Sequence, residues 1–186
     1  MLKAAAIALG LWAAGAGLAW AQASPTATEL RAGLEGRWVG ALGYRDYQTD
    51  RLFELPVRTS IDVVDDGVTA IRRSAFDDGP AGTVWIVSTS LDDPQAGTVT
   101  TATFREGREV ELLTETVEIV AYEGPQSWTI VYRRVGEDDD APADIRVTET
   151  RAGDELLSVK EVRPLGAGDD AWRFRNQTRL TLQSGG

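Results

Sequence analysis

The stretch LEGRWVGALGYRDYQ, residues 34–48, places a tryptophan just after Gly36-Arg37 and then alternates large and small side chains. Successive side chains of a β-strand point to opposite faces, so Trp38, Gly40, Leu42 and Tyr44 would share one face. The stretch therefore predicts the first strand of the fold. It leaves open whether that strand belongs to a ligand-holding barrel or to a well-packed edge.

The rest of the chain repeats this pattern without a sustained helical period. Short runs rich in valine, isoleucine, threonine and aromatic residues are divided by clusters of glycine, aspartate and proline, which favour tight turns. Short connections imply that consecutive strands pair in an antiparallel meander. Strands are expected near residues 37–47, 52–64, 68–76, 83–91, 98–105, 109–121, 126–135, 144–151, 155–163 and 171–182.

One face of these strands is apolar. In residues 53–63, Phe53, Leu55 and Val57 share a side, while Glu54 and Arg58 share the other. A meander with one apolar face buries it by closing into a barrel or by folding into a sandwich, and closure also removes exposed edges. The fold class is therefore all-β, with about 8–10 antiparallel strands closing into a barrel.

The N-terminus reads as two segments. Residues 1–23 have the features of a signal peptide: Lys3, an apolar run too short to span a membrane, and the small-residue site Ala21-Gln22-Ala23. Residues 24–35 read as a short helix capped by Thr26 or Thr28. The barrel domain would then occupy residues 36–183. The protein is expected to be periplasmic or secreted, with no membrane span after signal removal.

Composition excludes several functions. The net charge is −10, which disfavours nucleic-acid partners, and the chain contains neither histidine nor cysteine. Ser-His-Asp catalysis, the common zinc sites and histidine-ligated haem are therefore excluded. We expect no cofactor, no metal and no catalytic residue. Clusters such as Asp138-Asp139-Asp140 are interpreted as turns and not as calcium sites.

A membrane-spanning barrel is disfavoured by charge on the second face of the strands. A lipid-facing surface is apolar along every strand. The face that we expect to be wet carries Arg58, Asp62, Arg72 and Glu115, among other charged residues.

The short helix, the Gly36-Arg37-Trp38 opening and an arginine-rich last strand resemble the lipocalin and calycin group of small barrels. The resemblance implies that Trp38 packs across the closed end, covered by an arginine of the last strand, for which Arg173, Arg175 and Arg179 are the candidates. Nitrobindin-like barrels also begin with a Gly-x-Trp strand. Their haem is held by histidine, so that chemistry is not carried over to this chain.

Aromatic side chains supply the candidate ligand contacts. Such side chains with a few polar groups line many small-ligand cavities. The candidates are Tyr44, Trp85, Trp128, Tyr132 and Arg134.

Three functions follow from this pattern. The first is a module that binds a small apolar or amphipathic ligand. The second is a filled barrel that acts as a non-enzymatic envelope accessory for an unknown protein partner, and the third is a cofactor-free hydrolase that uses carboxylates and tyrosine. Interior volume distinguishes the first from the second.

Overall fold

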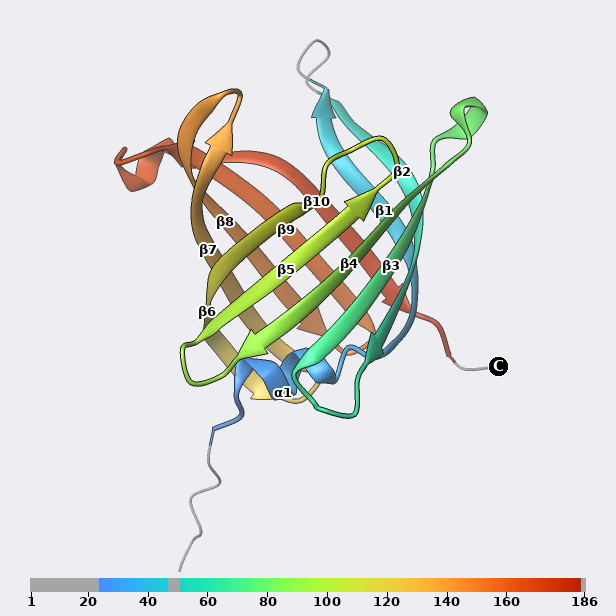
Figure 1. The fold of residues 1–186 in the computed structure, drawn as a ribbon, viewed down its shortest axis with the longest axis vertical. Helices are drawn as coiled ribbons and strands as arrows, with labels where there is room; N and C mark the ends of the chain where they lie inside the picture. The colour runs from blue at the N-terminus through green and yellow to red at the C-terminus, as the bar shows by residue number, and fades with distance from the viewer. Residues whose placement is uncertain (1–23, 47–50, 185–186) are drawn as a thin grey trace, which may run out of the picture.

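The computed structural model describes residues 24–46 and 51–184. Ten strands form one closed antiparallel barrel in which each strand pairs with the next, and β1 pairs with β10 to close it (Figure 1). The all-β meander is thus confirmed. The elements are α1 (Ala27–Ala32), β1 (Gly36–Asp46), β2 (Arg51–Val63), β3 (Thr69–Asp77), β4 (Thr83–Asp93), β5 (Thr98–Arg105), β6 (Glu111–Gly124), β7 (Ser127–Asp138), β8 (Ala141–Ala152), β9 (Glu155–Pro164) and β10 (Arg173–Leu182), with the 3₁₀ turns η1 (Gly79–Ala81) and η2 (Asp169–Ala171).

The strand boundaries follow the sequence closely except at the β7–β8 turn. The expected strands 126–135 and 144–151 left a long connection, but the structure has a hairpin with a two-residue turn, in which Asp139 and Asp140 adopt φ of 50° and 58°. Aspartate is one of the few residue types that tolerate this left-handed region. The two strands therefore continue further than the glycine and the proline suggested.

Helix α1 lies across one end of the barrel, where β1 begins (Figure 1). Its capping box is complete: the Glu29 amide donates to the Thr26 hydroxyl at 3.2 Å, and the Thr26 amide donates to the Glu29 carboxylate at 2.7 Å. Leu30 and Leu34 are buried in the barrel core. The helix thus closes this end. The hairpins β1–β2, β3–β4, β5–β6, β7–β8 and β9–β10 surround the opposite end, called the mouth below.

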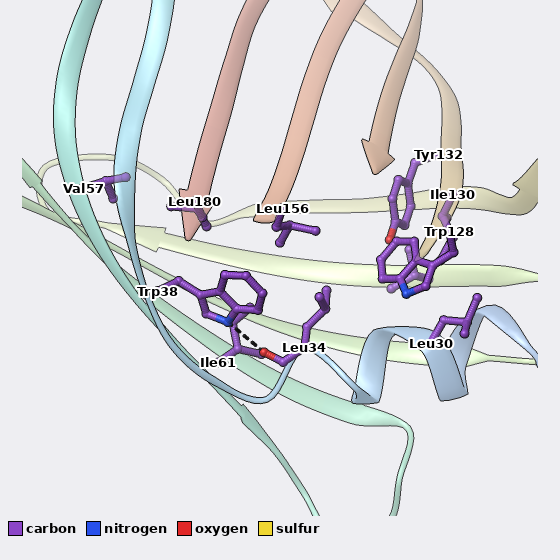
Figure 2. Close-up of a cluster of buried hydrophobic side chains, with 11 residues drawn as sticks. Leu30, Leu34, Trp38, Val57, Ile61, Trp128, Ile130, Tyr132, Leu156 and Leu180 are labelled. Carbon is purple, nitrogen blue, oxygen red and sulfur yellow. Dashed lines mark hydrogen bonds between the residues drawn. The ribbon is translucent and has the colours of Figure 1, made fainter. Parts of the chain in front are cut away.

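The apolar core fills the closed end of the barrel. Figure 2 shows side chains from α1, the segment after it, and strands β1, β2, β7, β9 and β10 converging there. Trp38 lies among them, 1% exposed, and its indole Nε1 donates to the Leu34 carbonyl oxygen at 2.9 Å (Figure 2). The first strand is thus anchored to the segment that closes the barrel.

No helix within residues 24–46 and 51–184 has the length and apolarity needed to cross a membrane. The expected signal peptide, residues 1–23, lies outside the described residues.

Candidate functional site in the barrel lumen

A cavity of about 180 Å³ remains inside the barrel above the apolar core. Leu34, Ile61 and Val99 supply apolar surface, and Arg72, Tyr132 and several hydroxyl and carboxylate side chains supply polar surface. The alternation of side chains along each strand explains why apolar and polar groups both line the cavity. Every second residue of a strand points into the lumen, whatever its chemistry. The lumen is thus packed at its closed end and hollow at its middle level.

Tyr132 and Glu149 form the buried centre of this cavity. The Tyr132 hydroxyl donates to Glu149 Oε2 at 3.1 Å, and Arg72 Nη2 lies 3.5 Å from Glu149 Oε1. Burial raises the pKa of Tyr132 well above its ordinary value, and the nearby charge of Glu149 raises it further. Tyr132 is therefore a neutral hydrogen-bond donor.

Arg31 joins the closing helix to the same network. Its guanidinium pairs with Asp92, contacts the Ser90 hydroxyl at 3.2 Å, and lies 5.7 Å from the centroid of the Tyr132 ring. Burial raises the pKa of Asp92, while the charge of Arg31 acts in the opposite direction. The position of α1 is thus coupled to charged groups inside the barrel.

Glu115 forms the second carboxylate of the cavity wall. Its Oε1 lies 3.4 Å from Arg134 Nε, and both side chains are mostly buried. Burial raises the pKa of Glu115 above its ordinary value of 4.5, although the charges of Arg134, Arg31 and Lys160 all lower it. One carboxylate thus faces three cations at this level of the lumen.

A larger hollow of about 800 Å³ lies at the mouth, beside the β7–β8 turn and the β9–β10 connection. Arg175 pairs there with Asp138 and with Asp139. On the outer side, the guanidinium carbons of Arg146 and Arg163 lie 4.2 Å and 4.7 Å from the centroid of the Trp172 ring. These contacts hold the β9–β10 connection against the barrel wall.

The structure brings two of the five predicted ligand contacts to the cavity region. Tyr132 lines the cavity, and Arg134 pairs with its wall residue Glu115. Trp128 is 2% exposed in the apolar core, where its Nε1 donates to the Pro125 carbonyl oxygen at 3.1 Å.

The other two candidates lie away from the cavity. Tyr44 packs on Phe53 near the mouth, with ring centroids 5.2 Å apart. The expectation that Trp85 lines the lumen is wrong. Trp85 is 57% exposed on the outer wall, because its neighbours in sequence take the inward positions of β4.

The arginine expected over Trp38 comes from a different strand. Arg173 and Arg175 lie at the start of β10, at the mouth, whereas Trp38 pairs with Leu182 at the end of that strand. Antiparallel pairing separates the two positions by the length of the barrel. The assignment of Arg173 or Arg175 to barrel closure is therefore wrong, and Arg151 of β8 takes that place, 5.9 Å from the Trp38 ring centroid.

Most of the charged residues that line the cavity were not predicted from the sequence. Arg72 and Glu115 were expected on the wet outer face, but both line the lumen. In β3, Arg72 lies between Ala70 and Ser74 on the same face of the strand. These two small side chains leave room in the lumen for the large side chain of Arg72. This pattern of small and large side chains could have indicated that Arg72 points inward, but its charge led to the prediction of an outward position.

Within the described part of the chain, no group of three acidic side chains is arranged to hold a metal ion. The cavity instead offers guanidinium, hydroxyl and carboxylate groups beside an apolar floor. These groups recognise small molecules by hydrogen bonds and charge, while the floor takes apolar atoms.

No family model matches the chain, and no curated protein matches it. The crystal structure of Rv2717c from M. tuberculosis is similar, with 17% identity, a TM-score of 0.56, and coverage of 86% of this chain and 100% of that chain. A putative outer membrane protein from Bacteroides fragilis is 12% identical, with a TM-score of 0.18 and coverage of 84% and 99%. The first likeness shows the barrel fold alone, and the second carries no argument. Membership of the lipocalin group is not confirmed.

Proposed function

We propose that this protein is an exported binding module that holds a small amphipathic molecule in its barrel lumen. The observation that carries the proposal is the cavity of about 180 Å³, which has an apolar floor and a polar wall inside an otherwise closed barrel. Such a lining suits a molecule with one apolar part and one polar part.

The volume of the cavity is large enough for a ligand and limits how large that ligand can be. A cavity of roughly 150 Å³ holds a benzene molecule in another protein, so this one accepts a benzene-sized body with a small polar group. The alternative, a filled barrel that works through its surface, requires side chains to occupy this space. They fill the closed end but not the middle level.

A non-enzymatic role is supported by the pairing of the cavity carboxylates. Glu149 is held by Tyr132 and Arg72, and Glu115 faces Arg134. Each carboxylate thus has a cation as its partner, as expected of groups that shape a binding site. The proposal predicts that a bound molecule is recovered chemically unchanged.

Native mass spectrometry of the protein purified from its own host tests the binding proposal. We expect an additional mass that disappears on denaturation and identifies the ligand. An apo mass, together with unchanged tryptophan fluorescence across a panel of small amphipathic molecules, would contradict the proposal and favour the filled-barrel alternative.

A lumen-filling variant locates the site. Ala70 lines the cavity, so Ala70→Phe should displace the ligand, whereas Ala102→Phe, at an outward position of β5, should retain it. Thermal unfolding of both variants shows that each remains folded. Equal retention by the two variants would place the ligand outside the lumen.

Export rests on residues 1–23 and has its own test. N-terminal sequencing of the protein from a periplasmic or culture-medium fraction should begin at Ser24. Recovery only in the cytoplasm, with Met1 retained, would contradict export and leave the binding proposal standing.

A further inference from the structure

Two cations in the lumen, Arg72 and Lys160, make no hydrogen bond to any described residue, and the buried Nε of a third, Arg134, has no hydrogen-bond partner. An arginine carries five N–H donors and a lysine three, so unpaired donors gather in this region. Buried donors are ordinarily satisfied by protein groups or by ordered water. Their concentration around one cavity indicates a site built for an acceptor.

The N–H groups of Arg72 are available to a ligand. It lines the cavity and keeps 37% of its side chain exposed, and its one ion pair, to Glu149, is long at 3.5 Å. Arg31 lines the same cavity and is engaged by both Asp92 and Ser90. The lumen thus engages Arg31 through two hydrogen bonds and leaves the guanidinium of Arg72 without one.

Lys160 lies on the inward face of β9. It pairs with Val147 of β8 and follows Ser158 by two residues, and both of these neighbours line the cavity. Paired residues, and residues two apart on a strand, point to the same side of a sheet. Lys160 is also the only lysine after Lys3, so it stands where the chain otherwise uses arginine.

The charges of the lumen do not cancel. The three carboxylates of this region each have an arginine: Asp92 with Arg31, Glu149 with Arg72, and Glu115 with Arg134. No carboxylate oxygen of the described residues lies within 4.0 Å of the Lys160 ammonium group. One positive charge therefore remains inside a protein whose net charge is −10.

We propose that the lumen is a site for a small amphipathic anion, whose carboxylate or phosphate is held by Lys160 and Arg72 while its apolar body rests on Leu34, Ile61 and Val99. The inference depends on the proposed binding function and specifies the class of ligand. A low-dielectric site strengthens such an ion pair, and the anion supplies the acceptor that the open donors lack.

Calorimetric titration with three probes that share a phenyl ring tests the charge requirement. Benzoate carries a carboxylate, benzamide is its neutral counterpart, and phenyl phosphate separates the two anion types. We expect one of the anions to bind at least about tenfold more tightly than benzamide, the order expected for hydrogen bonds to a charged group. Equal binding of anions and amide, or no binding of either anion, would overturn the inference.

Variants of Lys160 test whether this residue holds the anion. Lys160→Met should weaken anion binding by about tenfold or more and leave benzamide binding unchanged, while Lys160→Arg should restore it. Arg179→Met, an exposed outward position of β10, is the matched control and should bind like the unmodified protein. Thermal unfolding confirms that each variant is folded. Anion binding that is unaffected by Lys160→Met would overturn the assignment.

The outcomes separate this inference from the proposed function. A ligand retained in native mass spectrometry that proves to be neutral would refute the anion site and preserve the binding module. An apo protein that binds no probe would refute both.

Discussion

Arg151 covers Trp38 at the closed end of the barrel, with its guanidinium carbon 5.9 Å from the centroid of the indole ring. The same guanidinium donates to the carbonyl oxygens of Gly33 and Gly153. It therefore links the segment after α1 to the β8–β9 turn. The Arg151 side chain is buried, and both of these hydrogen bonds are partly buried.

Replacing Arg151 by methionine should lower the free energy of unfolding by about 1–3 kcal/mol, because two part-buried hydrogen bonds to backbone carbonyl oxygens are lost, each worth about 0.5–1.5 kcal/mol. Urea unfolding followed by tryptophan fluorescence measures the effect. Arg173→Met, at one of the positions that the family resemblance offered, should change stability by less than about 0.5 kcal/mol because Arg173 is exposed at the mouth. The reverse ranking would show that the closing arginine comes from the last strand.

Gly40 allows β1 and β10 to approach each other. A Cβ at this position would lie 1.8 Å from the backbone carbonyl oxygen of Arg179, so the backbone would have to move. Gly40→Ala should therefore destabilise the barrel by about 1–3 kcal/mol or more. At Gly43 the nearest atoms, at 3.2 Å, belong to the flexible Leu52 side chain, and Gly43→Ala should cost less. Thermal melts of the two variants compare them, and equal melting temperatures would refute this account.

The fold could be predicted because its signals are local. Alternation fixes which residues share a face, and clusters such as Gly153-Asp154 mark turns, so ten strands and their antiparallel order follow from neighbours in sequence. Thr26 was also identified as a possible cap of the helix, and it forms the complete capping box. These features need no knowledge of distant contacts.

The site could be predicted only in part because it depends on which face points inward. Apolar residues were assigned to the interior and charged residues to water, which placed Tyr132 correctly and Arg72 wrongly. The lumen tolerates charge because Arg72 and Glu149 meet from strands that are far apart in sequence. Arg151 was missed for the same reason, since its contact with Trp38 spans the chain.

Tyr132→Phe should lower the free energy of unfolding by about 1.5–3 kcal/mol, because it removes only the hydroxyl that donates to the buried Glu149 carboxylate. Tyr122→Phe is the matched control, since Tyr122 is exposed. Chemical denaturation at neutral pH measures both. A Tyr132→Phe variant as stable as the control would mean that Glu149 does not depend on this donor.

The carboxyl groups of Glu115 and Asp66 should titrate on opposite sides of their ordinary values. Burial raises the pKa of Glu115 above 4.5, whereas hydrogen bonds from Thr69 and from the Val68 amide lower the pKa of Asp66 below 3.8. Carbon-13 NMR of the carboxyl groups measures both values directly. A pKa for Glu115 at or below 4.5 would show that the charges of Arg134, Arg31 and Lys160 outweigh the effect of burial.

These directions fix the sign of the pH dependence of stability. Glu115 holds its proton to higher pH in the native state than in the unfolded chain. Its contribution to the free energy of unfolding is therefore fully present below pH 4.5 and is lost as pH rises through the folded pKa. Asp66 stabilises the folded state above pH 3.8, and this stabilisation is lost as pH falls through its folded pKa. Glu115→Gln should therefore abolish part of the decline in stability between pH 4.5 and neutral pH, as measured by urea unfolding at each pH. An identical slope in the variant would show that another group causes the decline.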